Sequence, residues 1–179
     1  SDEVCGLDAG LIAWYEFENN VEDSTENLRH GILEEDASFV DDLERGLVAS
    51  FDGDLDRIIL PNNEPVWLPN NDFSLSTWVY FNDDNAETDY ILDMNHADSG
   101  TPSNNIGYAL RRNNTGNAEF YMTLGDDANS YPDENLISDT ILISGNWYHL
   151  VGVRDGISQK LYINGVLDKS QACESYAVD

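Results

Sequence analysis

The chain has 179 residues, of which 41% are hydrophobic, and this length and composition fit one domain with a sizeable core. It carries 35 acidic residues against 8 basic ones, a formal net charge of −27. Such a surface repels nucleic acid and anionic membranes, so both are excluded as partners. The charge suits divalent cations or a saline environment, where salt screens self-repulsion, although solubility alone would also account for it.

The two ends of the chain bear on its cellular location. No run of 18 apolar residues is present, so no segment is predicted to insert into a membrane. The chain opens without a signal peptide, and Ser1 is typical of a processed or engineered N-terminus. Cys5 and Cys173 lie near opposite ends, and because the first and a late strand of a sandwich are often neighbours, we predict a disulfide between them. The alternative is two separate buried thiols, and the composition favours a secreted or cell-surface protein.

Short apolar stretches separated by clusters of Gly, Pro, Asn and Asp run through the chain, and helical periodicity is nearly absent. Many short strands at regular spacing predict an all-β fold, an antiparallel two-sheet β-sandwich of the jelly-roll kind. The predicted strands cover residues 11–18, 37–40, 48–51, 57–60, 73–82, 90–94, 107–111, 118–124, 137–143, 148–154 and 160–163.

The strand at residues 73–81 has two different faces. Its odd-numbered positions are mostly apolar and predict a side turned to the core. The even-numbered positions combine serines with Trp78 and Tyr80, a mixture typical of the concave, ligand-binding face of a sheet. The alternative is that a loop covers Trp78 and Tyr80, because large aromatic side chains are usually mostly buried.

The segment 146–167 is the most informative part of the chain. It alternates in two stretches, with Trp147, His149 and Val151 on one face of the first, which predicts two strands with one face in the core. Asn164-Gly165 ends the second stretch, and this pair suits a type I′ turn because both central residues need positive φ. We therefore predict an antiparallel hairpin, with His149 as a structural core residue.

Five segments carry motifs in a fixed order over nearly the whole chain. They cover residues 10–18, 23–31, 49–58, 73–79 and 146–167. Together they resemble the laminin G-like jelly-roll domain of the concanavalin A-like lectin/glucanase superfamily. Such domains normally continue past the Asn-Gly hairpin into two further strands, whereas this chain ends at Asp179. We therefore expect one domain over residues 1–179 that lacks its last strands, or a sheet that another chain completes, because an uncovered edge invites pairing.

Catalysis in the resembled superfamily uses two carboxylates on one strand in an E-x-D-x-x-E spacing. No candidate concave strand carries this motif. Glu16 and Glu18 share a face of the first predicted strand, and Asp93 is the next best acid, but none has a partner placed by the motif. We predict that the chain is not an enzyme, with a glycoside hydrolase or polysaccharide lyase as the alternative.

Calcium is the cofactor that the resemblance implies. Related domains often hold one calcium ion near the turn after the first strand, and the matching residues are Glu18, Asp23 and Asn27. Carboxylate, amide and carbonyl oxygens are the ligands that Ca²⁺ prefers. The ligand that the family takes from its last strand is missing here. In a chain with 35 acids, clusters such as residues 52–56 also arise by chance.

Aromatic and hydrogen-bonding side chains on the predicted strands favour a sugar ligand, because rings stack and amide or guanidinium groups bond to hydroxyls. Arg111 and Arg112 are adjacent and could bind an anionic group, although salt bridges to nearby acids are the alternative. The predicted ligand-binding residues are Trp78, Tyr80, Asn95, Tyr108, Arg111 and Tyr121.

These features predict a non-catalytic extracellular recognition domain that binds carbohydrate or a cell-surface glycan, assisted by calcium, within a larger adhesin or enzyme. The alternative is a protein–protein adhesion or assembly module.

Overall fold

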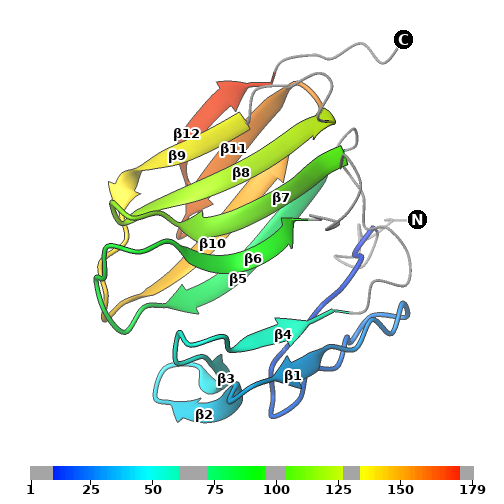
Figure 1. Cartoon of the computed structure of the whole chain (residues 1–179), viewed down its shortest axis with the longest axis vertical. Coiled ribbons are helices and arrows are strands. Elements are labelled where there is room, and N and C mark those ends of the chain that lie inside the picture. The colour runs from blue at the N-terminus through cyan, green and yellow to red at the C-terminus, as the bar shows by residue number, and fades with distance from the viewer. Residues whose placement is uncertain (1–9, 61–71, 96–103, 127–133, 174–179) are drawn as a thin grey trace, which may run out of the picture. The chain divides into compact units, whose positions relative to one another are not determined.

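The computed structural model describes residues 10–60, 72–95, 104–126 and 134–173. All regular structure in these ranges is β, which confirms the predicted class (Figure 1). None of the described residues forms a helix that is long and apolar enough to cross a membrane. The chain divides into two compact units, unit 1 (residues 1–65) and unit 2 (residues 66–179). One domain over residues 1–179 stays a prediction, because the two units are described separately.

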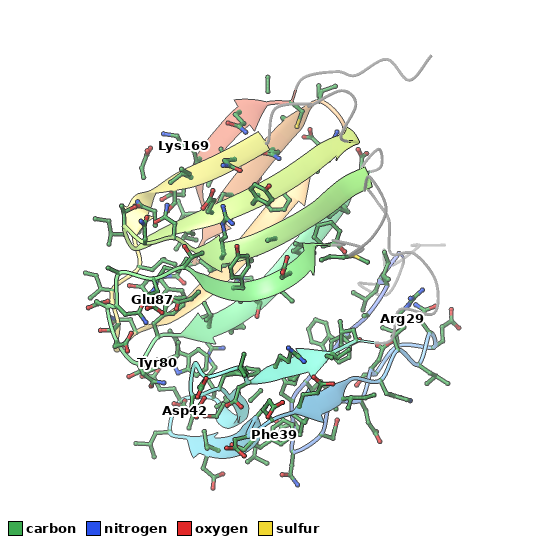
Figure 2. All side chains as sticks on the ribbon, viewed as in Figure 1. Arg29, Phe39, Asp42, Tyr80, Glu87 and Lys169 are labelled. Carbon is green, nitrogen blue, oxygen red and sulfur yellow. The ribbon has the colours of Figure 1, made fainter. Side chains whose placement is uncertain are left out.

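Unit 1 contains two small antiparallel pairs. The strand β1 (Ile32–Glu34) pairs with β4 (Arg57–Ile59), and β2 (Ser38–Asp42) pairs with β3 (Gly46–Ser50). Figure 2 shows the side chains of the described residues, including Arg29, Phe39 and Asp42 of this unit.

The predicted strand at residues 11–18 is wrong. Only Tyr15 makes a β-bridge there, to Asp23. Phe17 and Asn19 both take a φ of 58°, which ends an extended run. The Trp14 backbone N–H donates to the Asp23 carboxylate at 3.0 Å instead of to a neighbouring strand.

Unit 2 contains two four-stranded antiparallel sheets. Sheet A has the order β12-β11-β10-β5, and sheet B has the order β6-β7-β8-β9 (Figure 1). Their strands are β5 (Phe73–Tyr80), β6 (Asp89–Asn95), β7 (Asn104–Arg112), β8 (Asn117–Asp126), β9 (Glu134–Ile141), β10 (Trp147–Arg154), β11 (Ser158–Ile163) and β12 (Val166–Ala172).

The hairpin between β11 and β12 confirms the predicted turn. Asn164 has a φ of 52° and Gly165 a φ of 78°, as a type I′ turn requires. The chain then continues into β12, which is absent from the predicted strands and forms one edge of sheet A. Cys173 follows β12 and is buried, whereas Cys5 lies outside the described residues, so their disulfide stays a prediction.

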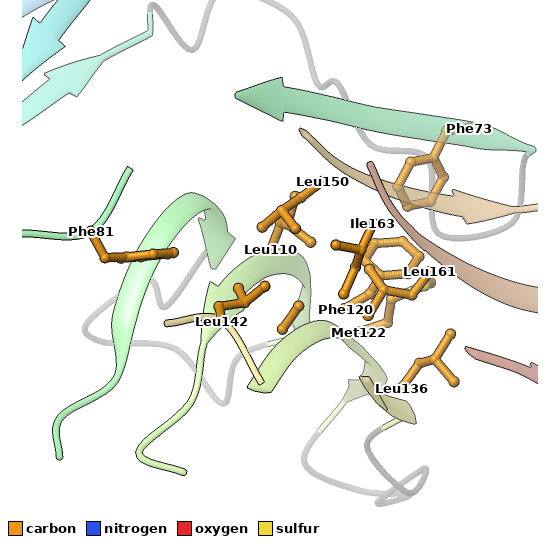
Figure 3. Close-up of a cluster of buried hydrophobic side chains, with 11 residues drawn as sticks. Phe73, Phe81, Leu110, Phe120, Met122, Leu136, Leu142, Leu150, Leu161 and Ile163 are labelled. Carbon is orange, nitrogen blue, oxygen red and sulfur yellow. The ribbon is translucent and has the colours of Figure 1, made fainter. Parts of the chain in front are cut away.

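The two sheets form a sandwich around one apolar cluster (Figure 3). Leu110 and Phe120 from sheet B and Leu150 and Leu161 from sheet A are each 0% exposed. Gly152 of β10 faces the same cluster, and a Cβ at this position would lie 2.9 Å from the Phe120 ring. Glycine is therefore required there for the ring to pack against sheet A.

The edge strands β9 and β12 are joined by side chains. The Asp168 carboxylate of β12 accepts the Asp139 backbone N–H at 2.7 Å and the Thr140 hydroxyl at 2.5 Å. Lys169 forms an ion pair with Asp139 at 2.5 Å. These contacts connect sheet A to sheet B along one side of the sandwich.

Candidate functional site

A group of four rings lies on the outer face of sheet A. In the register of β5 and β10, Trp78 stands opposite His149 and Tyr80 stands opposite Trp147. Tyr148 and Leu150 of β10 face the core. Because side chains alternate along a strand, Trp147 and His149 lie on the outer face. The four side chains form a two-by-two array that we call the aromatic platform.

The rings of the platform contact one another in pairs. Trp78 and His149 are stacked, with centroids 4.9 Å apart and planes at 23°. Tyr80 and Trp147 are tilted by 53°, with centroids 5.5 Å apart. Trp78 remains 46% exposed and Tyr80 40% exposed, which is high for large rings. An exposed aromatic surface of this kind is typical of a binding site.

Hydrogen bonds fix the position of His149. Its Nε2 lies 2.8 Å from the Ser76 hydroxyl, on the neighbouring strand. Its backbone N–H donates to the Asn164 side chain at 2.9 Å. The expectation that His149 is a core residue is wrong, because its half-buried ring stacks on an exposed tryptophan. Sequence reasoning missed Trp147, His149 and Ser76 as site residues, because the set that turns inward from Tyr148 includes a glycine and an arginine and is no more apolar than the outer set.

Arg111 lies on the outer face of sheet B, opposite Glu119 in the pairing of β7 and β8. Its guanidinium donates to both Glu119 oxygens, at 2.9 and 3.0 Å, and to the Tyr90 hydroxyl at 3.2 Å. It also lies 4.6 Å from the centroid of the Tyr121 ring. The hydrogen bonds to Glu119 raise the pKa of Arg111. The alternative of a salt bridge is therefore confirmed for this arginine.

The predicted ligand-binding residues fall on different faces of the sandwich. Trp78 and Tyr80 lie together on sheet A, whereas Arg111 and Tyr121 lie together on sheet B. The Tyr108 ring packs on the core cluster, 5.0 Å from the Phe73 ring, and burial raises its pKa. Asn95 ends β6, and its side chain lies outside the described part of the structure. Of the predicted residues, Trp78 and Tyr80 belong to the aromatic platform.

Asp23, the central residue of the predicted calcium set, organises unit 1. Its carboxylate accepts four hydrogen bonds, from the backbone N–H groups of Trp14, Thr25 and Arg29 and from the Thr25 hydroxyl, at 2.9 to 3.0 Å. Burial raises the pKa of Asp23, but these hydrogen bonds outweigh burial and lower it below its usual value.

The other residues of the calcium set differ from Asp23. Asn27 donates to the Ile12 carbonyl at 2.9 Å, and Glu18 is exposed. No group of three or more His, Cys, Asp or Glu side chains suited to a metal occurs among the residues that the structure describes. The predicted set has only two carboxylates, and its third ligand is an amide, so this absence does not test it. Calcium at Glu18, Asp23 and Asn27 therefore stays a prediction.

Four solved chains resemble this one, including the following two. A domain of an S-layer domain-containing protein (residues 221–444) from Clostridium thermocellum ATCC 27405 is 28% identical, with a TM-score of 0.55, over 89% of this chain and 71% of that one. Domain 4 of AbnA, a GH43 extracellular arabinanase from Geobacillus stearothermophilus solved with arabinotriose, is 21% identical, with a TM-score of 0.58, over 86% of this chain and 70% of that one. At that identity the second likeness shows the fold alone.

The family assignment comes from the sequence of residues 52–178, which matches the laminin G model of the concanavalin A-like lectin/glucanases superfamily. No match was found among curated proteins. The matched segment includes all the strands of unit 2, and the two-sheet sandwich built by these strands agrees with it. The chain therefore belongs to the concanavalin A-like lectin/glucanase superfamily.

Proposed function

We propose that this chain is a non-catalytic carbohydrate-binding module that works outside the cell, and that its aromatic platform is the binding site. The observation that carries the proposal is the two-by-two array of Trp78, Tyr80, Trp147 and His149 on the outer face of sheet A. Sugar rings present a face of C–H groups that packs on aromatic rings, while their hydroxyl groups need hydrogen-bond partners nearby.

The platform supplies both kinds of contact. Trp78 and Tyr80 offer exposed ring surface. The Ser76 hydroxyl and the His149 ring lie beside them, joined by a hydrogen bond that holds the imidazole in place. Because the rings come from two paired strands, their spacing is fixed before a ligand arrives, which lowers the entropic cost of binding. The site therefore suits an extended saccharide lying flat on the sheet.

The charge of the chain narrows the ligand class. A net charge of −27 repels polyanionic glycans. We therefore propose a neutral polysaccharide, such as an arabinan, as the partner. One structural neighbour is a domain of an extracellular arabinanase in complex with arabinotriose, and another belongs to an S-layer domain-containing protein. Both support a secreted or cell-surface location, within a larger enzyme or adhesin.

Affinity electrophoresis of the whole chain in gels containing neutral polysaccharides, with and without calcium, tests the proposal. The wild-type protein should be retarded by at least one polymer. Trp78→Ala should weaken that binding by about fivefold or more, because stacking on an aromatic ring contributes about 1 to 3 kcal/mol per base at nucleic-acid sites. Trp14→Ala is the matched control, since Trp14 is 53% exposed and lies in unit 1.

Two results would overturn the platform as a saccharide-binding site. One is the absence of retardation in every gel, and a dimer in solution would then favour the adhesion module. The other is equal binding by Trp78→Ala and the wild-type protein, which would place the saccharide elsewhere. Release of reducing sugar from the polymer, lost in Asp93→Ala or Glu16→Ala, would instead indicate an enzyme.

A further inference from the structure

We propose that a pocket at one end of unit 2, separate from the aromatic platform, binds a single uncharged sugar unit. The pocket has a volume of about 270 Å³ and is lined by residues 84–86, 114–116 and 141–143, with Arg112 among them. It extends the proposed function, on which it rests for the class of ligand. Its position and chemistry are independent of the platform.

The three loops around the pocket are tied together. The Asp84 carboxylate accepts the Ser144 backbone N–H at 2.7 Å and the Ser144 hydroxyl at 2.9 Å. The Leu142 backbone N–H donates to the Gly116 carbonyl at 2.7 Å. These bonds join the β5–β6, β7–β8 and β9–β10 connections to one another. The pocket is therefore formed without a ligand, as small-molecule sites usually are.

The charged groups at the pocket are satisfied within the protein. Arg112 is 2% exposed, and its Nε lies 2.7 Å from the Asp89 carboxylate. Its Nη1 donates to the Asp83 carbonyl at 2.9 Å, and its guanidinium lies 4.0 Å from the Phe81 ring centroid. The hydrogen bonds from Ser144 lower the pKa of Asp84. A charged ligand would disturb this balance, so the pocket favours an uncharged one.

Two amides and two apolar side chains face the ligand space. The side chain of Asn114 and the Nδ2 of Asn85 make no hydrogen bond to any other residue that the structure describes, so both are available to a ligand. Ile141 and Ile143 are each 57% exposed beside them. Hydroxyl groups on one side and C–H groups on the other are the chemistry of a sugar ring.

The size and position of the pocket agree with one sugar unit. Its volume is just below the range of about 300 to 1,000 Å³ for drug-sized ligands. It lies at the end of the sandwich where β5 finishes, because the Gly145 N–H donates to the Phe81 carbonyl at 3.0 Å. Figure 2 shows Tyr80 and Glu87 at this same end of unit 2. A chain end or a side branch of a polysaccharide has the size of this pocket.

Nuclear magnetic resonance of the labelled whole chain tests the proposal with four probes: L-arabinose, D-xylose, D-glucose and D-galactose. At least one monosaccharide should shift the side-chain amide signals of Asn85 and Asn114. Asn114→Ala and Asn85→Ala should each weaken this binding by about tenfold, since each removes a hydrogen bond to the ligand. Trp78→Ala should leave it unchanged.

The outcomes separate the pocket from the platform. The pocket would be overturned if none of the four sugars, at tens of millimolar, shifted the side-chain amide signals. It would also be overturned if the shifts persisted unchanged in both asparagine variants. Indole N–H shifts of Trp78 and Trp147 with a polysaccharide report on the platform alone. If those are absent while the amide shifts depend on Asn114, the platform fails and the pocket stands.

Discussion

Unit 1 and unit 2 are each stabilised internally by a different kind of interaction. In unit 2, a cluster of leucine and phenylalanine side chains is removed from water between two sheets. In the described part of unit 1, no apolar side chain is buried, and Trp14 and Ile32 are 53% and 61% exposed. The buried side chain there is Asp23, at 3% exposure. Unit 1 is organised by hydrogen bonds to one carboxylate, whereas unit 2 is organised by apolar packing.

Phe120→Ala should have the largest effect, and it should act on unit 2. The ring is 0% exposed and lies at the centre of the cluster, so its loss creates a cavity in the core. We expect the free energy of unfolding to fall by about 3 to 5 kcal/mol, measured by urea denaturation with tryptophan fluorescence. Ile137→Ala on the exposed face of β9 is the control, with a change of about 0.5 kcal/mol or less.

Asp23→Asn should loosen unit 1 and leave unit 2 intact. The amide keeps the shape of the carboxylate but places a donor against backbone donors, at a cost of about 2 kcal/mol. We expect faster hydrogen exchange at the Thr25 and Arg29 amides, with no change at Leu150. If hydrogen exchange became equally faster in both units, Asp23 would not stabilise unit 1 alone, and the comparison would fail.

The same carboxylate makes unit 1 sensitive to acid. The pKa of Asp23 is lowered in the folded state, so its contribution to stability is complete above the unfolded value of about 3.9 and is lost as the pH falls through the folded value. Below pH 4, exchange protection at Arg29, corrected for the intrinsic rate, should drop in the wild type. Asp23→Asn should show no such drop, and a parallel drop in the variant would assign the effect to other acids.

Gly152→Ala should destabilise unit 2 by less than Phe120→Ala does. A Cβ at this position would come within 2.9 Å of the Phe120 ring, so strand or ring must shift. Overpacking of this kind costs about 1 to 3 kcal/mol, which a thermal melt followed by circular dichroism would detect. Combining it with Phe120→Ala provides a check, because the double variant should lose less than the sum of the two changes.

Calcium should give the smallest effect, confined to unit 1. If Glu18, Asp23 and Asn27 hold the ion, a calcium concentration about ten times the dissociation constant should raise the melting midpoint of unit 1 by about 6 °C or more. Asp23→Asn should abolish the increase. A wild-type midpoint that is the same in calcium and in EDTA would remove the predicted cofactor.

Much of the fold of unit 2 was predictable from local pattern. The alternation in residues 73–81 identified β5 and placed Trp78 and Tyr80 on its outer side. In β7 the pattern was less clear, because Tyr108 and the charged Arg112 share a face with Leu110 and all three turn inward. A buried ion pair conceals the core face of a strand from any reasoning based on hydrophobicity.

The site was only partly predictable, because it depends on pairing between distant strands. Ser76 and His149 are 73 residues apart in sequence, and only the register of β5 with β10 brings them together. In unit 1, the predicted strand at residues 11–18 failed because Asp23 captures the Trp14 amide, a competition between side chain and backbone that alternation does not reveal.

The carboxylate of Asp168 has a consequence for the behaviour of the protein at high concentration. By accepting the Asp139 backbone N–H, it occupies a donor on β9 that could otherwise start a ladder with another molecule. Lys169 adds a charge at the same place. Side chains of this kind on edge strands oppose amyloid-like stacking. Asp168→Ala should therefore leave a sandwich that folds but aggregates more readily during expression.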